Sequence, residues 1–445
     1  MNSSNNKMKI LIITNLFPNS KEPTRGIYNK QQFVELAKLC EIKVVAPLPL
    51  HYRERVPERE NIDGIDTYHP RYFMIPKVGR SLYGLFFYLS LIKKVKKIYE
   101  NFKFDLIFAT WAYPDGFGSF LIAKALNKPI VIKVHGSDIN LYTEYFLRRK
   151  MIAYALKNCN KVIAVSKALK ERIVKIGVPE DKIVVIPNGV DTDLFKPLER
   201  DRCRERLELP QDKKIVLFVG NLVPVKGVDV LVEAFARLPA GMLLVLVGDG
   251  PLKNKLQAKV KEFGIENNVI FVGRTRHEAI PYYMNACDIF CLPSLNEGCP
   301  NVILESIACG KPVVASNVGG VREIICSDDM GILIKPANAT VLARAFIRGV
   351  SKKWNFRLIR EEALKYSWTD NALKLRRELE VSMESSVLFK TNHLRRFIKE
   401  LLSHIIPRNI VIWRGRHSKK IALTFDDGPN TRFTPKILKI LKEKM

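Results

Sequence analysis

Two glutamates around a predicted helix start form the stretch with the clearest chemical meaning. Glu297 precedes Pro300, which suits the first turn of a helix, and Gly310 suits the end of that helix. Glu305 would then lie on the second turn, on the same face as Asn301. Free N–H groups at a helix start can bind phosphate, and a carboxylate one turn further in can accept hydrogen bonds from ribose hydroxyls. The spacing indicates a nucleotide diphosphate site, although a capped helix with solvated glutamates would give the same pattern.

Glycine-containing turns after predicted strands support the same chemistry. In residues 218–227 a strand, a turn with Gly220 and a helix start follow one another, and Lys226 stands where its cation could neutralise a diphosphate. Gly248 lies in a turn at a strand's carboxyl edge, where open α/β sheets bind ligands. Gly26 follows the first strand and would let the backbone approach a phosphate closely. One such glycine is a weak indication, but four elements in this order are a strong one.

The elements that would position these residues are apolar runs alternating with helix-length segments. The runs are continuously apolar and rich in β-branched residues, as in strands buried on both faces of a parallel sheet. The first series covers Lys9–Thr14, Lys43–Ala46, Asp105–Thr110, Pro129–Val134, Lys161–Val165 and Ile183–Ile186, and the second covers Ile215–Gly220, Met242–Gly248, Asn268–Gly273, Asp288–Leu292, Pro312–Ser316 and Gly331–Ile334. Two successive α/β units are therefore predicted, with the charged stretch Pro197–Pro210 as the hinge between them.

Composition limits the classes of protein and partner. The 445 residues suggest roughly three domains, and 47% hydrophobic with 27% charged residues excludes disordered and collagen-like chains. The net charge of +28 favours nucleic acid, anionic lipid or a charged substrate, but we find no nucleic-acid recognition motif. Eight cysteines without a CxxC pair or zinc spacing are expected to be buried thiols in a reducing compartment.

Apolar segments predict a cytoplasmic protein with one stretch suited to a membrane surface. The N-terminus has no signal-peptide pattern, and the longest apolar run, Leu82–Ile92, falls short of the ~20 residues that span a bilayer. Residues 71–104 combine eight Lys/Arg with several aromatic residues and a single Glu. Such a helix could lie on the anionic inner face of the plasma membrane or could be a core helix with a solvated basic end, and the sequence leaves both open.

The glutamate pair and the glycine turns resemble the retaining glycosyltransferases of family 4 (glycosyl transferases group 1), over residues 8–383. Further motifs that carry the resemblance are Ile186-Pro-Asn-Gly-Val-Asp, Pro312-Val-Val-Ala-Ser and Gly319-Gly-Val-Arg-Glu. Arg25-Gly-Ile-Tyr and His135-Gly-Ser-Asp look most like the subgroup that makes teichuronic-acid-type and related surface polysaccharides.

The resemblance implies a GT-B fold, in which two Rossmann-like parallel-sheet domains face each other across a cleft. The expected parts are an acceptor domain over 1–200, a nucleotide-sugar domain over 201–366, a helix over 367–386 that packs back on the first domain, and a last segment over 387–445. The implied reaction moves a hexosyl-type sugar from a nucleotide diphosphate sugar, expected to be a UDP-sugar, to a cell-wall or exopolysaccharide acceptor that could be lipid-linked. No cofactor or metal is expected, because cations and helix N–H groups neutralise the diphosphate.

Residue roles follow from the same resemblance. Lys226 would stabilise the leaving diphosphate, Glu297 would lie over the donor sugar, and His135 would lie near the sugar and the acceptor unless it is only a hydrogen-bonded loop histidine. The expected donor-binding residues are Gly26, Asn221, Gly248, Arg274, Gly298, Asn301 and Glu305. Asn221 is a departure, since many members carry a basic residue there, so Lys226, Arg274 or Arg25 would bear more of the neutralisation.

The last segment resembles a different family, the NodB-homology polysaccharide deacetylases, which form a (β/α) barrel. Asp426 would be the general base and Asp427 a ligand of a divalent metal. That metal site needs two downstream histidines, whereas 18 residues follow Asp427 and none is a histidine. We therefore expect a truncated, catalytically inactive fragment whose parent acted on N-acetylated polysaccharide.

Alternatives to a transferase remain at this point. The chain could be a bifunctional transferase and deacetylase whose hydrolase half is incomplete, or a nucleotide-sugar epimerase, since these share the GT-B architecture. A non-catalytic binding protein is disfavoured because Lys226, Glu297 and Glu305 are all present.

Overall fold

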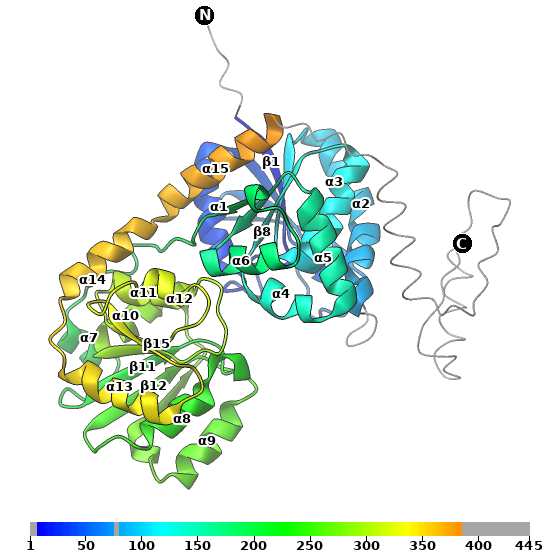
Figure 1. Ribbon diagram of the computed structural model, residues 1–445. Coiled ribbons are helices and arrows are strands. Elements are labelled where there is room, and N and C mark those ends of the chain that lie inside the picture. The colour runs from blue at the N-terminus through cyan, green and yellow to red at the C-terminus, as the bar shows by residue number, and fades with distance from the viewer. Residues whose placement is uncertain (1–6, 75–79, 385–445) are drawn as a thin grey trace, which may run out of the picture. The chain divides into compact units, whose positions relative to one another are not determined.

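The first domain contains a mostly parallel sheet (Figure 1). The computed structural model describes residues 7–74 and 80–384. The strand order is β10-β9-β8-β7-β1-β2-β5-β4, and only the pairing of β4 with β5 is antiparallel. The strands are β1 (Lys9–Ile13), β2 (Glu41–Val45), β4 (Arg59–Ile62), β5 (Ile65–Tyr68), β7 (Leu106–Thr110), β8 (Ile130–Val134), β9 (Lys161–Ala164) and β10 (Ile183–Val185), and a separate pair joins β3 (Leu48–Pro49) to β6 (Arg71–Tyr72). The principal helices are α1 (Ile27–Leu39), α2 (Tyr83–Asn101), α3 (Phe117–Leu126), α4 (Ser137–Asn140), α5 (Phe146–Asn158) and α6 (Lys167–Lys175).

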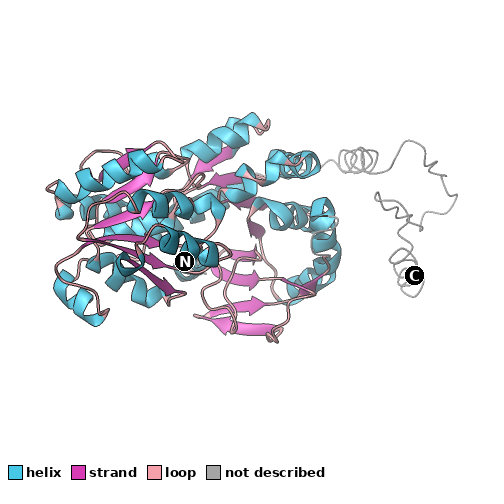
Figure 2. Cartoon of the chain, turned by 90° about the horizontal axis from the view of Figure 1, so that it is seen from below, coloured by secondary structure: helices cyan, strands magenta, loops and turns pink. Residues whose placement is uncertain are grey.

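The second domain repeats the plan with a fully parallel sheet in the order β13-β12-β11-β14-β15-β16. Its strands are β11 (Lys214–Val219), β12 (Met242–Val247), β13 (Val269–Gly273), β14 (Ile289–Leu292), β15 (Val313–Ser316) and β16 (Gly331–Ile334). Its helices are α7 (Arg200–Arg206), α8 (Val228–Phe235), α9 (Lys253–Glu262), α10 (Ile280–Ala286), α11 (Asn301–Ala308), α12 (Val321–Ile324), α13 (Ala339–Ser351) and α14 (Phe356–Ala363). Figure 2 shows the strands of both sheets with helices beside them.

All of the predicted apolar runs form strands, and the predicted α/β class with two parallel sheets is confirmed. In the central strands most side chains are fully buried because helices cover both faces of each sheet, whereas the edge strands β10 and β13 are mostly half-buried. The sequence did not predict β4 and β5, since Arg59–Ile62 has a polar pattern without a buried residue. This antiparallel hairpin forms the edge of the first sheet, where one face can remain polar.

The chain crosses between the domains at Pro187–Gly189. Ile186 packs in the first core and Val190 in the second. Helix α15 (Trp368–Glu384) follows the return crossing and packs on α1, where its Leu375 joins the first core. A Cβ on Gly189 would lie 2.8 Å from the Trp368 Cα, so a glycine is needed where the two crossings touch.

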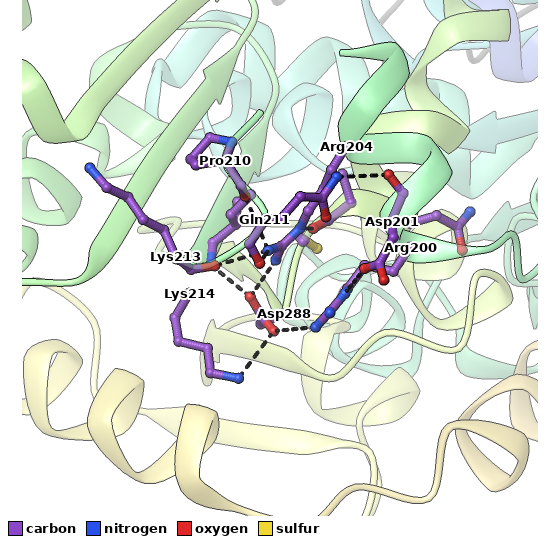
Figure 3. A network of polar contacts seen from close by, with 12 residues as sticks. Arg200, Asp201, Arg204, Pro210, Gln211, Lys213, Lys214 and Asp288 are labelled. Carbon is purple, nitrogen blue, oxygen red and sulfur yellow. Dashed lines mark hydrogen bonds and ion pairs between the residues drawn. The ribbon is translucent and has the colours of Figure 1, made fainter. Parts of the chain in front are cut away.

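The prediction that Pro197–Pro210 is the hinge is wrong, because this stretch belongs to the second domain. Cys203 and Leu209 lie in the second core, and the Arg204 side chain is 1% exposed. The guanidinium donates to four backbone carbonyls and to Asp288, 2.8 Å away (Figure 3). A cation can be buried here because its donors are satisfied, and the resulting network fixes the loop before β11 to the end of α10.

Helix α2 buries the apolar face of the basic, aromatic stretch. Phe87, Leu91, Val95 and Ile98 are at most 5% exposed, so this face belongs to the core. The opposite face carries Leu89, which is 63% exposed, and basic side chains. No helix among the described residues is long and apolar enough to cross a membrane.

The cysteine prediction holds for most positions. Within residues 7–74 and 80–384 the cysteines are free thiols, and all but two of them are buried. Cys299 is only partly buried and Cys326 is exposed, so the expectation of buried thiols is wrong for Cys326, which lies in the loop after α12. Burial raises the pKa of the Cys159 and Cys287 thiols to about 12, which keeps them protonated.

Candidate active site

A cavity of about 490 Å³ lies between the carboxyl ends of strands from both domains. The first domain contributes side chains that include Tyr28, Trp111, His135 and Asn140, and the second contributes Asn221, Lys226, His277, Glu297, Asn301 and Glu305. Trp111 and His135 directly follow β7 and β8, and Asn221 follows β11. Open α/β sheets bind ligands at this edge because the strand ends and the following loops leave a crevice there. Most of the residues predicted from separate motifs are therefore brought together in one cavity.

Lys226 and Glu297 form an ion pair in this cavity. Lys226 Nζ lies 2.6 Å from Glu297 Oε1, and the Ser294 hydroxyl donates to the same oxygen over 2.6 Å. The Lys226 turn can pack on the 293–295 loop because residue 227 is glycine, with φ of 64° and a Cβ position only 2.2 Å from the Pro293 carbonyl oxygen. The pair is thus held by two loops that the fold presses together, and the lysine stands beside the start of α11.

Glycines bring the two domains into backbone contact next to Glu297. A Cβ on Gly298 would lie 1.8 Å from the His135 carbonyl oxygen, and Gly136 stands opposite it. Behind the loop, a Cβ on Gly319 would lie 1.9 Å from the Glu297 carbonyl oxygen. A side chain at Gly298 or Gly136 would push the Glu297 loop away from the first domain, and one at Gly319 would clash with the backbone of Glu297 itself. Close approach between backbones therefore explains why glycines occupy these positions.

Glu305 is paired with a histidine that the sequence reasoning missed. His277 Nε2 lies 2.9 Å from Glu305 Oε1, and both side chains are mostly buried. Burial alone would lower the pKa of His277, but the hydrogen bond and the charge of Glu305 outweigh it and raise that pKa. The pair joins the start of α10 to the second turn of α11. No spacing in the sequence indicates it, because only the fold brings these residues together.

His135 lies in an aromatic environment on the opposite side of the cavity. Its ring is 5.2 Å from Tyr28 and 6.0 Å from Trp111 between centroids. Burial, together with the nearby Lys133, holds the pKa of His135 well below its ordinary value, so the ring is neutral at pH 7. Its Nε2 atom is buried and has no partner among the described residues. A neutral imidazole with a free ring nitrogen can donate or accept one hydrogen bond to a ligand.

Asp138 fixes the position of His135, which gives the His135-Gly-Ser-Asp motif a structural reason. Its carboxylate accepts from the backbone N–H of Ala112, at 2.8 Å, Gly136, at 2.8 Å, and His135, at 3.1 Å. Burial raises the pKa of Asp138 in spite of these hydrogen bonds, which act in the opposite direction. The carboxyl group therefore joins the loops after β7 and β8 around the histidine.

Three other predicted donor-binding residues do not line the cavity. Gly26 begins α1 with φ of 59°, and a Cβ there would lie 2.2 Å from the Leu16 carbonyl oxygen. Gly248 packs its backbone against Gly220 between the turns that follow β11 and β12. Arg274 is exposed, and its charge contributes to lowering the pKa of Glu22. Neither glycine nor Arg274 belongs to the cavity lining.

Three family models match the chain. Glycosyltransferase Family 4 matches residues 28–194, Glycosyl transferases group 1 matches residues 199–365, and Polysaccharide deacetylase matches residues 414–445. Asp426 and Asp427 lie within the last match and outside the described residues. A protein named for teichuronic acid biosynthesis, the glycosyltransferase TuaC of Bacillus subtilis strain 168, is 33% identical over 77% of this chain and 89% of its own length.

Solved structures show the same fold at low sequence identity. Sucrose-phosphate synthase from Thermosynechococcus elongatus superposes with a TM-score of 0.73 and 23% identity, over 84% of this chain and 100% of that one. Anabaena HepE, solved in complex with UDP, has a TM-score of 0.65 and 24% identity, over 84% and 100% of the two chains. A further HepE structure contains UDP-glucose. The fold is therefore GT-B, with two Rossmann-like domains.

Proposed function

The chain belongs to the group 1 glycosyltransferases, and we propose that it moves a hexosyl-type sugar from a UDP-sugar to a growing surface polysaccharide with retention at the anomeric carbon. The family matches favour the transferase over the epimerase. The observation that carries the proposal is the Lys226–Glu297 pair beside the start of α11, in a cavity that both domains line.

The donor would bind mainly to the second domain. Helix α11 begins at Asn301, and both Asn301 and Val302 line the cavity, so the free N–H groups at this helix start and the Lys226 ammonium would bind a diphosphate. Glu305 has Oε1 bonded to His277, so its other oxygen can accept from ribose hydroxyls. His277 would then act as a positioning residue that keeps the Glu305 carboxylate oriented.

In the transfer step the bond between the anomeric carbon and the diphosphate oxygen breaks. An acceptor hydroxyl oxygen forms the new bond on the same face of the sugar, and its proton passes to the departing diphosphate. Lys226 would stabilise the negative charge that develops on the diphosphate, which is a large effect in a water-poor site. Glu297 would bind hydroxyls of the donor sugar, and the neutral His135 would bind the sugar from the first domain.

Donor and acceptor classes are proposed from the relatives. HepE has been solved with UDP-glucose, which supports a UDP-sugar here. The TuaC relative is named for teichuronic acid biosynthesis, which supports a cell-wall polysaccharide as acceptor. An acceptor on a lipid carrier would fit a chain that lies on the inner membrane face, and the outward face of α2, with Leu89 and its lysines, is the surface that we propose for this contact.

A second activity is suggested by the match at residues 414–445. We infer that the transferase is joined to the beginning of a polysaccharide deacetylase, with Asp426 and Asp427 in its first motif. Both activities would then concern the same N-acetylated glycan. Mass analysis of an N-acetylated oligosaccharide incubated with the purified protein and a divalent metal tests this: loss of an acetyl group would support a second activity, and an unchanged mass would count against it.

Release of nucleoside diphosphate by the purified full chain tests the transferase proposal. The chain would be supplied with a panel of UDP- and GDP-sugars, with and without a lipid-extract acceptor and with EDTA. We expect acceptor-stimulated release from one UDP-sugar that EDTA does not reduce and that Lys226→Ala abolishes. Folded wild-type protein that releases nothing from any donor would refute the proposal, and a requirement for metal would refute its metal-free form.

A further inference from the structure

A lysine is buried beneath the cavity at the end of β8, two residues before His135. The Lys133 side chain is fully buried, and its Nζ donates to Gln32 Oε1 and to Asn188 Oδ1, each at 3.0 Å. Among the described residues no carboxylate pairs with it. Burial lowers the pKa of Lys133 to about 7, against a smaller opposing effect of the Cys299 thiol. This lysine therefore changes its charge within the working pH range.

The ammonium form of Lys133 fixes the direction of a chain of side-chain amides. An ammonium group has donors only, so both amides must turn their oxygens toward it. Gln32 Nε2 is then left to donate to Asn371 Oδ1, and Asn371 Nδ2 donates to the Pro187 carbonyl. This first arm runs from β8 through α1 to α15 and ends on a backbone carbonyl, which can only accept, so its direction agrees with an ammonium at Lys133.

The second arm runs the other way and ends at the cavity. Asn188 lies at the crossing between the domains, and with its oxygen on Lys133 its Nδ2 donates to Asn301 Oδ1 over 2.8 Å. Asn301 is the first residue of α11 and lines the cavity. Because its oxygen is occupied by Asn188, its Nδ2 group is the end left for a ligand. The first arm therefore ends at the Pro187 carbonyl, whereas the second ends at the Asn301 Nδ2 group, which can donate to a ligand in the cavity.

We propose that Lys133 is a positioning residue for the nucleotide-sugar: acting through Asn188, it keeps the Asn301 side-chain N–H groups turned toward the cavity, where they donate to a diphosphate oxygen. The inference rests on the proposed function, because it assigns the diphosphate to the start of α11. An uncharged Lys133 amine can also accept a hydrogen bond. The amides can then reverse, and the Asn301 oxygen that turns to the cavity repels the diphosphate.

The arrangement couples donor binding to the charge of Lys133. The groups that face this lysine are Gln32 from α1, Asn188 from the crossing, the Cys299 thiol from the loop before α11, and His135 from its own strand end. A bound diphosphate favours the charged lysine, so binding above pH 7 takes up a proton. Donor affinity should therefore fall as the pH rises above about 7.

Calorimetric binding of UDP-glucose to the full chain tests the coupling. Titrations would be run from pH 6.5 to 8.5 in two buffers of different ionisation enthalpy, with wild type, Lys133→Met and the matched control Lys161→Met. Lys161 stands on the neighbouring strand β9, at the end of the strand away from the cavity, and its Nζ donates to the Asp181 carbonyl oxygen. A nucleotide-sugar diphosphate has no group of its own that titrates in this range, so proton uptake reports on the protein.

We expect wild type and Lys161→Met to bind several-fold more weakly at pH 8.5 than at pH 6.5, with buffer-dependent heats. Lys133→Met should bind about tenfold more weakly than wild type at pH 6.5 and should lose most of the pH dependence, leaving only the part that His277 contributes to all three proteins. Gln32→Glu would place a carboxylate beside the ammonium and keep it charged, so its affinity should stay at the acid-side level up to pH 8.5.

Several outcomes would overturn the inference. The inference is refuted if Lys133→Met has the same donor affinity and the same pH dependence as Lys161→Met. It is also refuted if the heat of binding to wild type does not depend on the buffer. Either result leaves the proposed transferase function intact. If UDP-glucose does not bind, the donor selected by the release panel replaces it. If no panel member binds, the proposed function fails and this inference fails with it. If circular dichroism shows that Lys133→Met does not fold, two other measurements test the inference. These are the proton uptake by wild type and the pH dependence of donor affinity in Gln32→Glu.

Discussion

The ionisable side chains on the two sides of the cleft have different environments. On the first-domain side, burial lowers the pKa of His135 in the cavity lining and raises that of Asp138, which holds the His135 loop, so each is shifted toward its uncharged form. On the second-domain face the ionisable side chains lie in close pairs, Lys226 with Glu297 and His277 with Glu305. Two domains of the same architecture thus present one face dominated by desolvation and one dominated by ion pairs.

This difference between desolvated and paired groups fits the parts of the substrate that each domain would bind. An anionic diphosphate is stabilised by fixed cations and helix N–H groups, which the second domain holds in place before the ligand arrives. Sugar hydroxyls are neutral and need directional hydrogen bonds rather than charge, and a neutral imidazole supplies these without attracting the wrong ion. The following variants test this comparison, in order of decreasing effect.

Glu297→Gln should cause the largest loss, on the charged face. The amide keeps the size of the side chain and its contact with Ser294, but it no longer holds the Lys226 ammonium in place. We expect kcat to fall about 10²–10³-fold, the range found when a single transition-state contact is removed. Initial rates of nucleotide release measure this. Ser294→Ala, which removes one hydrogen bond only, should lose several-fold, and a wild-type kcat in Glu297→Gln would contradict the charged-face interpretation.

Glu305→Ala should weaken donor binding rather than the chemical step. Hydrogen bonds to a charged group contribute about 1.5–3 kcal/mol, so KM for the donor should rise by about 10–100-fold with little change in kcat. His277→Asn, which leaves the carboxylate without its partner, should have a smaller effect in the same direction. Steady-state kinetics with ribo- and 2′-deoxyribonucleotide sugars separate the roles. A variant that still prefers the ribose donor as strongly as wild type would show that Glu305 does not contact the ribose.

The two histidines should change the pH dependence of stability in opposite directions. The pKa of His277 is raised above 6.5, so its stabilising contribution is full below pH 6.5 and is lost as the pH rises through the folded value. The pKa of His135 is lowered below 6.5, so the wild-type fold loses stability as the pH falls below 6.5.

Urea unfolding of His277→Asn and His135→Asn at pH 5 and pH 8 measures this contrast. Relative to wild type, His277→Asn should lose more stability at pH 5 than at pH 8, whereas His135→Asn should lose less at pH 5. The differences should be on the order of 1 kcal/mol, since one pKa unit corresponds to about 1.4 kcal/mol. Equal shifts in both variants would remove the distinction between the faces.

Removing a hydrogen bond that joins the two domains should have the smallest effect of the changes considered, and it should be seen in stability. The Glu323 carboxylate accepts from the backbone N–H groups of Lys167 and Ala168 at the start of α6, and Asn140 bonds to Asn296 over 2.6 Å. Removing a cap of this kind costs about 1 kcal/mol, so Glu323→Ala should lower the melting temperature by a few degrees. Asn140→Ala should change it less. Calorimetry would measure the melting temperatures of both variants. Arg357→Ala, which changes an exposed helix residue, is the control.

Much of the fold and part of the site could be predicted from local patterns. Strands buried on both faces have a continuous apolar signature, and the helix with Asn301 and Glu305 is bounded by a proline and a glycine, so these were predicted correctly. The hinge was misplaced because Pro197–Pro210 is charged, and sequence alone does not reveal that Arg204 satisfies its donors inside the core. His277 was missed because a lone histidine far along the chain from Glu305 carries no periodicity.

The sequence by itself determined the α/β class and the buried strands of both sheets, and it predicted Lys226, Glu297 and His135 as candidate site residues, because strand burial and turn chemistry are local properties. Only the tertiary structure decided which groups are neutral and which are paired, since desolvation and Coulomb interactions depend on neighbours in space. The Lys133 chain shows this most clearly: five amide and ammonium side chains from five parts of the sequence become one directed network only when both domains and α15 are folded together.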